Sequence, residues 1–141
     1  MPYATTDDLA ERLTPEVLAL LADDDADGTP DSATLEAALA DASALIDLAL
    51  AGRYTTPVDP APPTLAVWCA DLASETLFLR RPEALPEAQA HRAARAHRAL
   101  EAITTGAAAL PGAQPRLEDF ETDNTRREDE PAFSPESLDV Y

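Results

Sequence analysis

The sequence predicts an all-α fold, a small helical bundle around one long central helix. The first observation is a run of apolar residues between positions 35 and 50 that recur at the spacing of one helix face. The second is that residues 1–22, 63–80 and 86–104 also carry helix start signals and apolar spacing. The third is that prolines and glycines separate these segments, so the chain reads as several helices joined by connectors.

The central helix is expected to end near residue 50, in a stretch that continues to Val58. Asp31 and Ser32 are its N-cap candidates, and Gly52 stands where a glycine readily adopts a left-handed C-terminal cap. Alanines occupy much of the remaining surface, so a neighbouring helix could approach closely. The apolar stripe consists of Leu35, Leu39, Ala42, Ile46, Ala49 and Leu50.

The other helices are predicted from the same signals. Residues 1–22 read as one or two short helices, capped by Thr5 or Thr6 and by Thr14. Gly106 is expected to close the last helix. The helix over 63–80 has the stripe Leu65, Trp68/Cys69, Leu72, Thr76 and Leu79, and the helix over 86–104 has Ala93, Ala96, Leu100 and Ile103.

Charge is the most unusual global property. Ten basic residues stand against 27 acidic residues, a formal net charge of −17. Such a surface repels phosphate backbones and disfavours binding to nucleic acid. Two interpretations stay open: the charge serves solubility, or it forms a surface past which nucleic acid moves without sticking.

No pattern of catalytic residues is present, so the protein is expected not to be an enzyme and to need no cofactor and no metal. Cys69 is the single cysteine and is expected to be buried and inert. Asp71 and Glu75 are interpreted as a solvated acidic edge. No apolar run is long enough to span a membrane, and the N-terminus has no secretory signal, which predicts synthesis in a cytoplasm.

The acidic stretch over 23–31 admits two interpretations. Asp23, Asp25 and Asp27, followed by Gly28, match the first ligand positions of a calcium-binding loop. However, Thr34 stands where that loop carries a bidentate glutamate. The other interpretation is an acidic connector with a glycine turn, and any divalent-ion binding is expected to be weak.

Two stretches are predicted to contact partners. Three arginines with two histidines form the most basic stretch, which suits either an acidic surface on a neighbouring subunit or charge balance within the chain. Residues 1–110 are expected to form the helical domain, and residues 111–141 a proline-containing acidic arm that becomes ordered on a partner. The predicted contact residues are Arg92, Arg95, Arg98, Phe133, Leu138, Val140 and Tyr141.

Several stretches resemble the Mu-like bacteriophage head–tail connector (adaptor) family, which also occurs in phage-derived gene transfer particles. The resemblance covers roughly residues 1–111. It is most specific where the central helix runs into Ala51-Gly52-Arg53-Tyr54 and then Pro57. Further matching stretches are Tyr3 to Leu9, Asp24 to Asp31, Ala70 to Ala73, Arg80-Arg81 and Leu100 to Gly106.

The resemblance implies a virion protein that forms a ring, expected to be a dodecamer, beneath the portal protein. Such a ring extends the DNA channel without binding DNA specifically and anchors the stopper or other tail-proximal proteins. It implies no membrane contact, and it makes the arginines and the chain terminus candidates for subunit and portal contacts. The alternative is an acidic, calcium-responsive helical interaction module that uses the loop from Asp23 to Gly28.

Overall fold

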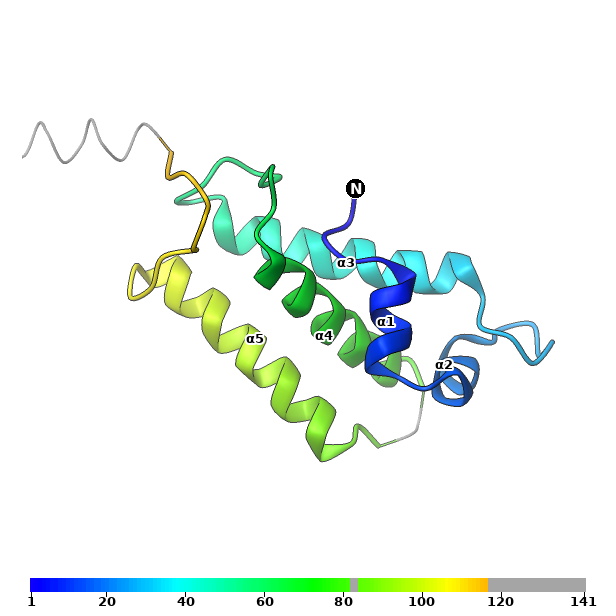
Figure 1. Cartoon of the computed structure of the whole chain (residues 1–141). Coiled ribbons are helices and arrows are strands. Elements are labelled where there is room, and N and C mark those ends of the chain that lie inside the picture. Colours follow the sequence, from blue (N-terminus) through cyan, green and yellow to red (C-terminus); the bar gives the residue numbers. More distant parts are fainter. Residues whose placement is uncertain (82–83, 117–141) are drawn as a thin grey trace, which may run out of the picture.

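The fold is all-α over residues 1–81 and 84–116, which are the residues that the computed structural model describes. A single antiparallel bridge pairs Tyr54 with Pro115 in this part of the chain. No helix of the described residues is long and apolar enough to cross a membrane. The five helices are α1 (Thr6–Arg12), α2 (Pro15–Ala22), α3 (Ser32–Leu50), α4 (Pro63–Leu79) and α5 (Glu87–Thr105) (Figure 1).

Helices α3, α4 and α5 form the bundle, and α1 lies across α3 and α4 (Figure 1). The helix at the centre is α4, which packs against each of the other four helices. The sequence pattern suggested α3 for this position, because α3 is a long helix with an apolar stripe and a defined end. A helix with neighbours on several sides has no such stripe, and α4 buries Leu65, Cys69, Ala70, Asp71, Leu72, Ala73, Ser74, Leu77 and Phe78.

The predicted stripes of α3 and α5 are confirmed as core faces, with Leu35, Leu39, Ala42, Ile46 and Leu50 buried in α3 and Ala93, Ala96, Leu100 and Ile103 buried in α5. The stripe predicted for α4 is wrong at its end, because Leu79 is 73% exposed while Leu77 and Phe78 are buried. On α3, Leu45 and Leu48 point away from the core and are 49% and 76% exposed.

The helix ends confirm some of the predicted caps and correct others. Thr5 is the cap of α1 and forms a capping box with Asp8, and Thr14 caps α2 through the backbone amide of Val17. Asp31 precedes α3 without capping it through its side chain, because its carboxylate accepts a hydrogen bond from the backbone of Asp24 at 2.8 Å.

The two glycines predicted as helix caps behave differently. Gly106 ends α5 in the left-handed conformation, with φ of 84°. The left-handed cap predicted at Gly52 is wrong. Instead, Ala51 keeps a right-handed helical conformation, and Arg53 and Tyr54 both donate backbone hydrogen bonds to the carbonyl of Leu50. The chain therefore leaves α3 through a tight right-handed turn.

The chain after α5 returns to the C-terminal end of α3. The hydroxyl of Tyr54, a buried residue, accepts a hydrogen bond from the backbone amide of Leu110 at 2.7 Å. The backbone amide of Arg116 donates to the carbonyl of Arg53 at 2.9 Å. The proline-rich connector that follows this turn is fixed as well, because the Tyr3 hydroxyl accepts from the amide of Val58 at 2.9 Å. Residues 107–116 are thus held against the turn that follows α3.

Candidate interaction surfaces

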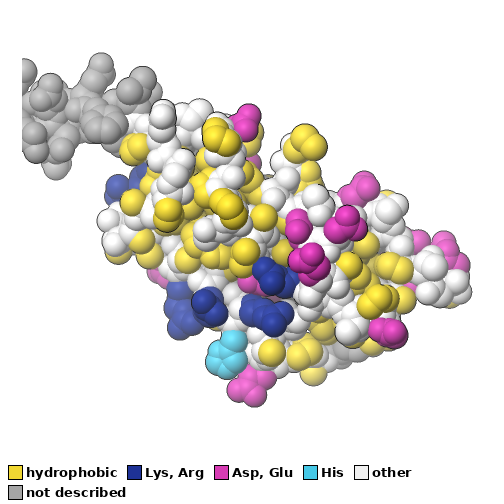
Figure 2. Space-filling model, in the orientation of Figure 1, with side chains coloured by type: hydrophobic (Ala, Val, Ile, Leu, Met, Phe, Trp, Pro, Cys, Tyr) yellow, Lys and Arg dark blue, Asp and Glu magenta, His cyan; other side chains and the backbone are white. Residues whose placement is uncertain are grey.

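The arginine face is formed by Arg92, Arg95 and Arg98, which lie three residues apart on α5. All three side chains are exposed. They lie outside the buried stripe of α5, which consists of Ala93, Ala96, Leu100 and Ile103. Within residues 1–81 and 84–116, none of the three makes a hydrogen bond or an ion pair. Figure 2 shows dark-blue side chains gathered over α5.

A buried ion pair lies beside this face. The guanidinium Nε of Arg12 in α1 is 3.1 Å from a carboxylate oxygen of Asp71 in α4, and the two side chains are 28% and 9% exposed. Burial raises the pKa of Asp71, while the positive charges of Arg12, Arg92 and Arg95 act to lower it. The prediction that Asp71 belongs to a solvated edge is therefore wrong. Helix α1 covers that side of α4 and supplies the counter-charge.

The two histidines of α5 contact different carboxylates. His91 lies 3.5 Å from Glu87 on its own helix, and His97 lies 2.8 Å from Glu75 on α4. The histidines are therefore not arranged as a shared metal site. The contact between His97 and Glu75 links α5 to α4 on the solvent side of the bundle.

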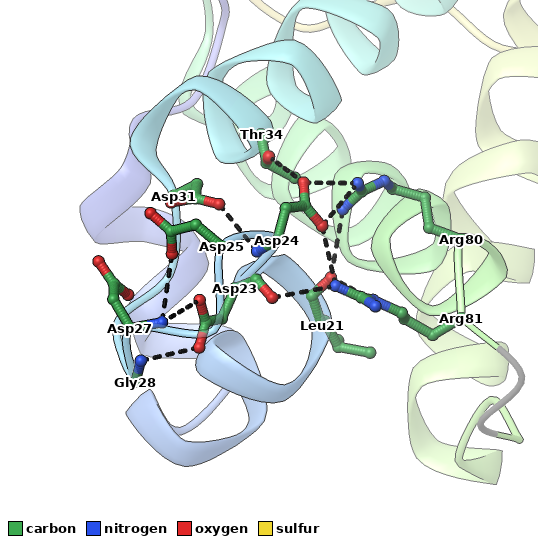
Figure 3. Close-up of polar contacts among 10 residues, drawn as sticks. All are labelled: Leu21, Asp23, Asp24, Asp25, Asp27, Gly28, Asp31, Thr34, Arg80 and Arg81. Carbon is green, nitrogen blue, oxygen red and sulfur yellow. Dashed lines mark hydrogen bonds and ion pairs between the residues drawn. The ribbon is translucent and has the colours of Figure 1, made fainter.

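The acidic loop between α2 and α3 is held by two arginines from the end of α4 (Figure 3). The carboxylate of Asp24 pairs with Arg80 at 2.9 Å and with Arg81 at 2.8 Å, and it accepts a hydrogen bond from the Thr34 hydroxyl at 2.8 Å. The hydrogen bonds from Thr34 and Arg80 lower the pKa of Asp24. Arg80 and Arg81 also donate to the carbonyl of Leu21, so they fasten the C-terminal end of α2 and the loop to α4.

The loop brings the three carboxylates of the calcium-loop interpretation close together. Oxygens of Asp23, Asp25 and Asp27 lie within 4.8 Å of one another. The Asp23 carboxylate already accepts the backbone amides of Asp27 and Gly28, at 3.1 and 2.8 Å (Figure 3). Thr34 bonds to Asp24. Calcium takes six to eight oxygens, so the three carboxylates would need further ligands to hold the ion.

Sequence comparison places this bundle among phage proteins. The family described as "Bacteriophage Mu, Gp36" matches residues 3–128 of this chain. The chain belongs to this family. Gene product J of Escherichia phage Mu is 46% identical over 74 residues, which are 52% of this chain and 52% of that protein. The chain thus matches about half the length of this curated relative.

The Gp36 family match includes every surface described above. It extends past residue 116 and so past the described bundle. The predicted contact residues Phe133, Leu138, Val140 and Tyr141 lie outside both the family match and the described residues.

Sequence reasoning missed the exposed apolar side chains of this family member. Leu48 on α3 is 76% exposed and Leu79 at the end of α4 is 73% exposed. A cavity of about 710 Å³ also separates the proline-rich connector from residues 112–116, and Val58 and Pro115 line it. In the sequence, only the position of Leu48 outside the stripe of α3 indicated that it would be exposed. That position predicts exposure only when it is known which sides of α3 the other helices cover.

Cys69 has the environment that the sequence predicted. Its side chain is buried between α4 and α3, 3.3 Å from the hydroxyl of Ser43. Burial raises the pKa of its thiol, which favours the protonated and less nucleophilic form.

Proposed function

We propose that this Gp36-family protein is a head–tail connector (adaptor) of a tailed phage or phage-derived particle. In this proposal, copies of the chain form a ring, expected to be a dodecamer, beneath the portal protein. The ring extends the DNA channel and anchors the stopper or other tail-proximal proteins. The observation that carries the proposal is the family match over residues 3–128, together with the identity to a phage Mu protein.

The charge of the chain supports this role. DNA carries a dense negative charge, and a protein wall of the same sign repels it at the short distances found in a channel. A net charge of −17 suits a channel through which DNA moves without specific binding. The proposal assigns the protein no catalytic activity, no cofactor and no membrane contact. It locates the protein at the head–tail interface of the virion after synthesis in the bacterial cytoplasm.

The surfaces available for assembly are of two kinds. The arginine face offers positive charge to an acidic partner surface, and arginine forks match carboxylates in paired geometry. The exposed side chains of Leu45 and Leu48 offer apolar area on a different helix, α3. Together with the terminal residues Phe133, Leu138, Val140 and Tyr141, these are the proposed subunit and portal contacts.

The test is co-purification with the portal protein encoded beside this gene. The protein is expressed alone and with the portal, and the mass of each purified species is measured by light scattering. A complex with a fixed number of copies per portal ring supports the connector role. A chain that ignores the portal but gains thermal stability from calcium contradicts it and favours the calcium-responsive module.

A further inference from the structure

We propose that, in the free chain, the acidic C-terminal segment over residues 117–141 docks on the arginine face of the same molecule. The proposed contact is between its carboxylates and the guanidinium groups of Arg92, Arg95 and Arg98. The segment thereby covers one of the surfaces proposed above as a subunit or portal contact. The inference concerns the unassembled protein, so it stands or falls independently of the connector role.

In the described part of the chain, the arginine face is a run of three arginines without direct carboxylate contacts. Arg53 is a further exposed arginine, and its guanidinium lies against Gly106. All ten basic residues of the chain are arginines. Arg12 pairs with Asp71, Arg80 and Arg81 pair with Asp24, and Arg116 donates to the carbonyl of Ala51 at 2.8 Å. The arginines of the face lie about 4.5 Å apart along the helix axis. Their long side chains let neighbouring guanidinium groups engage different carboxylates of one extended chain.

The segment has the complementary charge. Residues 117–141 contain nine acidic residues and two arginines, so they carry −7 of the net −17. Two groups of acidic residues stand out, one from Glu118 to Asp123 and one from Glu128 to Glu130. Charge of this density is repelled by most of the acidic bundle surface and attracted to the arginine face.

The position where the segment begins makes an intramolecular contact accessible. Arg116 is held to Arg53, and the guanidinium of Arg53 lies against Gly106 at the C-terminal end of α5. The segment therefore starts beside the helix that carries the arginine face. Its 25 residues, if extended, reach roughly 80 Å, whereas the 19 residues of α5 span about 28 Å. A tether of this length gives an effective concentration near the millimolar range, which favours the chain's own segment over that of another copy in dilute solution.

The experiment uses the full-length chain with a nitroxide spin label on a cysteine introduced by Ala132→Cys. Buried Cys69 does not compete for the label, and the wild-type chain treated identically is the control for this. We expect the label to broaden the amide NMR signals of residues 91–98. The broadening should disappear in 1 M salt, because the Debye length falls to about 3 Å.

A charge exchange separates this contact from a general change in structure. Arg92→Glu, Arg95→Glu and Arg98→Glu together should abolish the broadening, as should Glu128→Arg, Asp129→Arg and Glu130→Arg together. Combining the two sets should restore it. Because the three arginines are exposed on α5, the circular dichroism of the helices should stay unchanged. If a variant does unfold, the loss of broadening in 1 M salt, measured on the wild-type chain, tests the contact instead.

Three results would overturn the proposal. The first is broadening that maps to another surface of the bundle. The second is broadening of residues 91–98 that persists in the arginine variant. The third is broadening that passes between molecules when labelled chains are mixed with isotope-enriched unlabelled chains, which would assign the contact to a neighbouring copy.

Discussion

At the residue scale, the ion pair between Arg12 and Asp71 is a largely buried charged contact between α1 and α4. Removing Arg12 leaves a carboxylate buried without its counter-charge, which costs more than the loss of an exposed pair. We expect Arg12→Met to lower the free energy of unfolding by about 2 kcal/mol in urea denaturation. Arg98→Met, at an exposed position, is the matched control and should stay within about 0.5 kcal/mol. Adding Asp71→Leu to Arg12→Met should recover part of the loss, and a further loss would contradict this account.

The same carboxylate predicts a pH dependence. The folded-state pKa of Asp71 lies above its ordinary value of 3.8 because burial disfavours the charged form. The folded state then binds a proton more tightly than the unfolded state, so the contribution of Asp71 to stability falls as pH rises from 3.8 through the raised value. Asp71→Asn removes the titrating group. As pH rises through this window, we therefore expect the free energy of unfolding of the wild type to fall relative to that of the variant. Parallel pH profiles would contradict the raised pKa.

Asp71 also shows where residue-level prediction stops. Its spacing from Glu75 on a helix was visible in the sequence, and Glu75 does lie near the surface, where His97 contacts it. Asp71 differs because α1 crosses α4 at that point, and the crossing depends on packing between segments far apart in the chain. By contrast, the burial of Cys69 followed from its own helix face and was predicted.

At the element scale, the ends of α3 and α5 were both predicted from a glycine, Gly52 and Gly106. Substituting each glycine tests whether it has the left-handed conformation that was predicted. Gly106 has φ of 84°, a conformation that L side chains rarely adopt, whereas the Arg53 guanidinium that an added Cβ would meet is the end of a flexible side chain and can move away. Gly52 has open space around its Cα and a φ outside the left-handed region. We expect Gly106→Ala to destabilise the fold by about 1–2 kcal/mol, while Gly52→Ala is neutral or slightly stabilising. Thermal unfolding of both variants is the measurement, and equal losses would contradict the difference in conformation.

Helix positions and their core faces were largely readable from the sequence, because apolar spacing and caps are local properties. The stripe of α5 and the caps at Thr5 and Thr14 illustrate this. The central position of α4 was not readable in the same way. A helix surrounded on several sides has small and apolar residues around most of its circumference, and that pattern gives a weaker periodic signal than the stripe of α3.

At the scale of the whole molecule, the sequence indicated the family more clearly than the interaction surfaces. The resemblance rested on the stretch around Ala51 to Tyr54, and the family match over residues 3–128 confirms a Mu-like phage protein. The arginine face was visible as a basic stretch, and the structure adds that it is exposed and beside a buried ion pair. The acidic loop was the clearest apparent ligand site, yet its hydrogen bonds are largely internal.

The exposed face of α3 gives the last prediction, which rests on the connector role. Leu48 is 76% exposed in the isolated chain, so its side chain contributes little to the folded monomer. We expect Leu48→Glu to change the free energy of unfolding by less than about 0.5 kcal/mol. In a ring, the same substitution would bury an unpaired charge in an apolar contact, and assembly should fail or weaken strongly.

The measurement is the yield of portal complex by light scattering, with Leu48→Met as the matched control. Methionine keeps an apolar side chain of similar volume at that position and should leave assembly intact. Full assembly of the Leu48→Glu variant would exclude this side of α3 from the subunit contact. If neither variant nor the wild-type chain joins the portal, the failure lies with the connector role itself. The wild-type sample therefore separates an error about the surface from an error about the function.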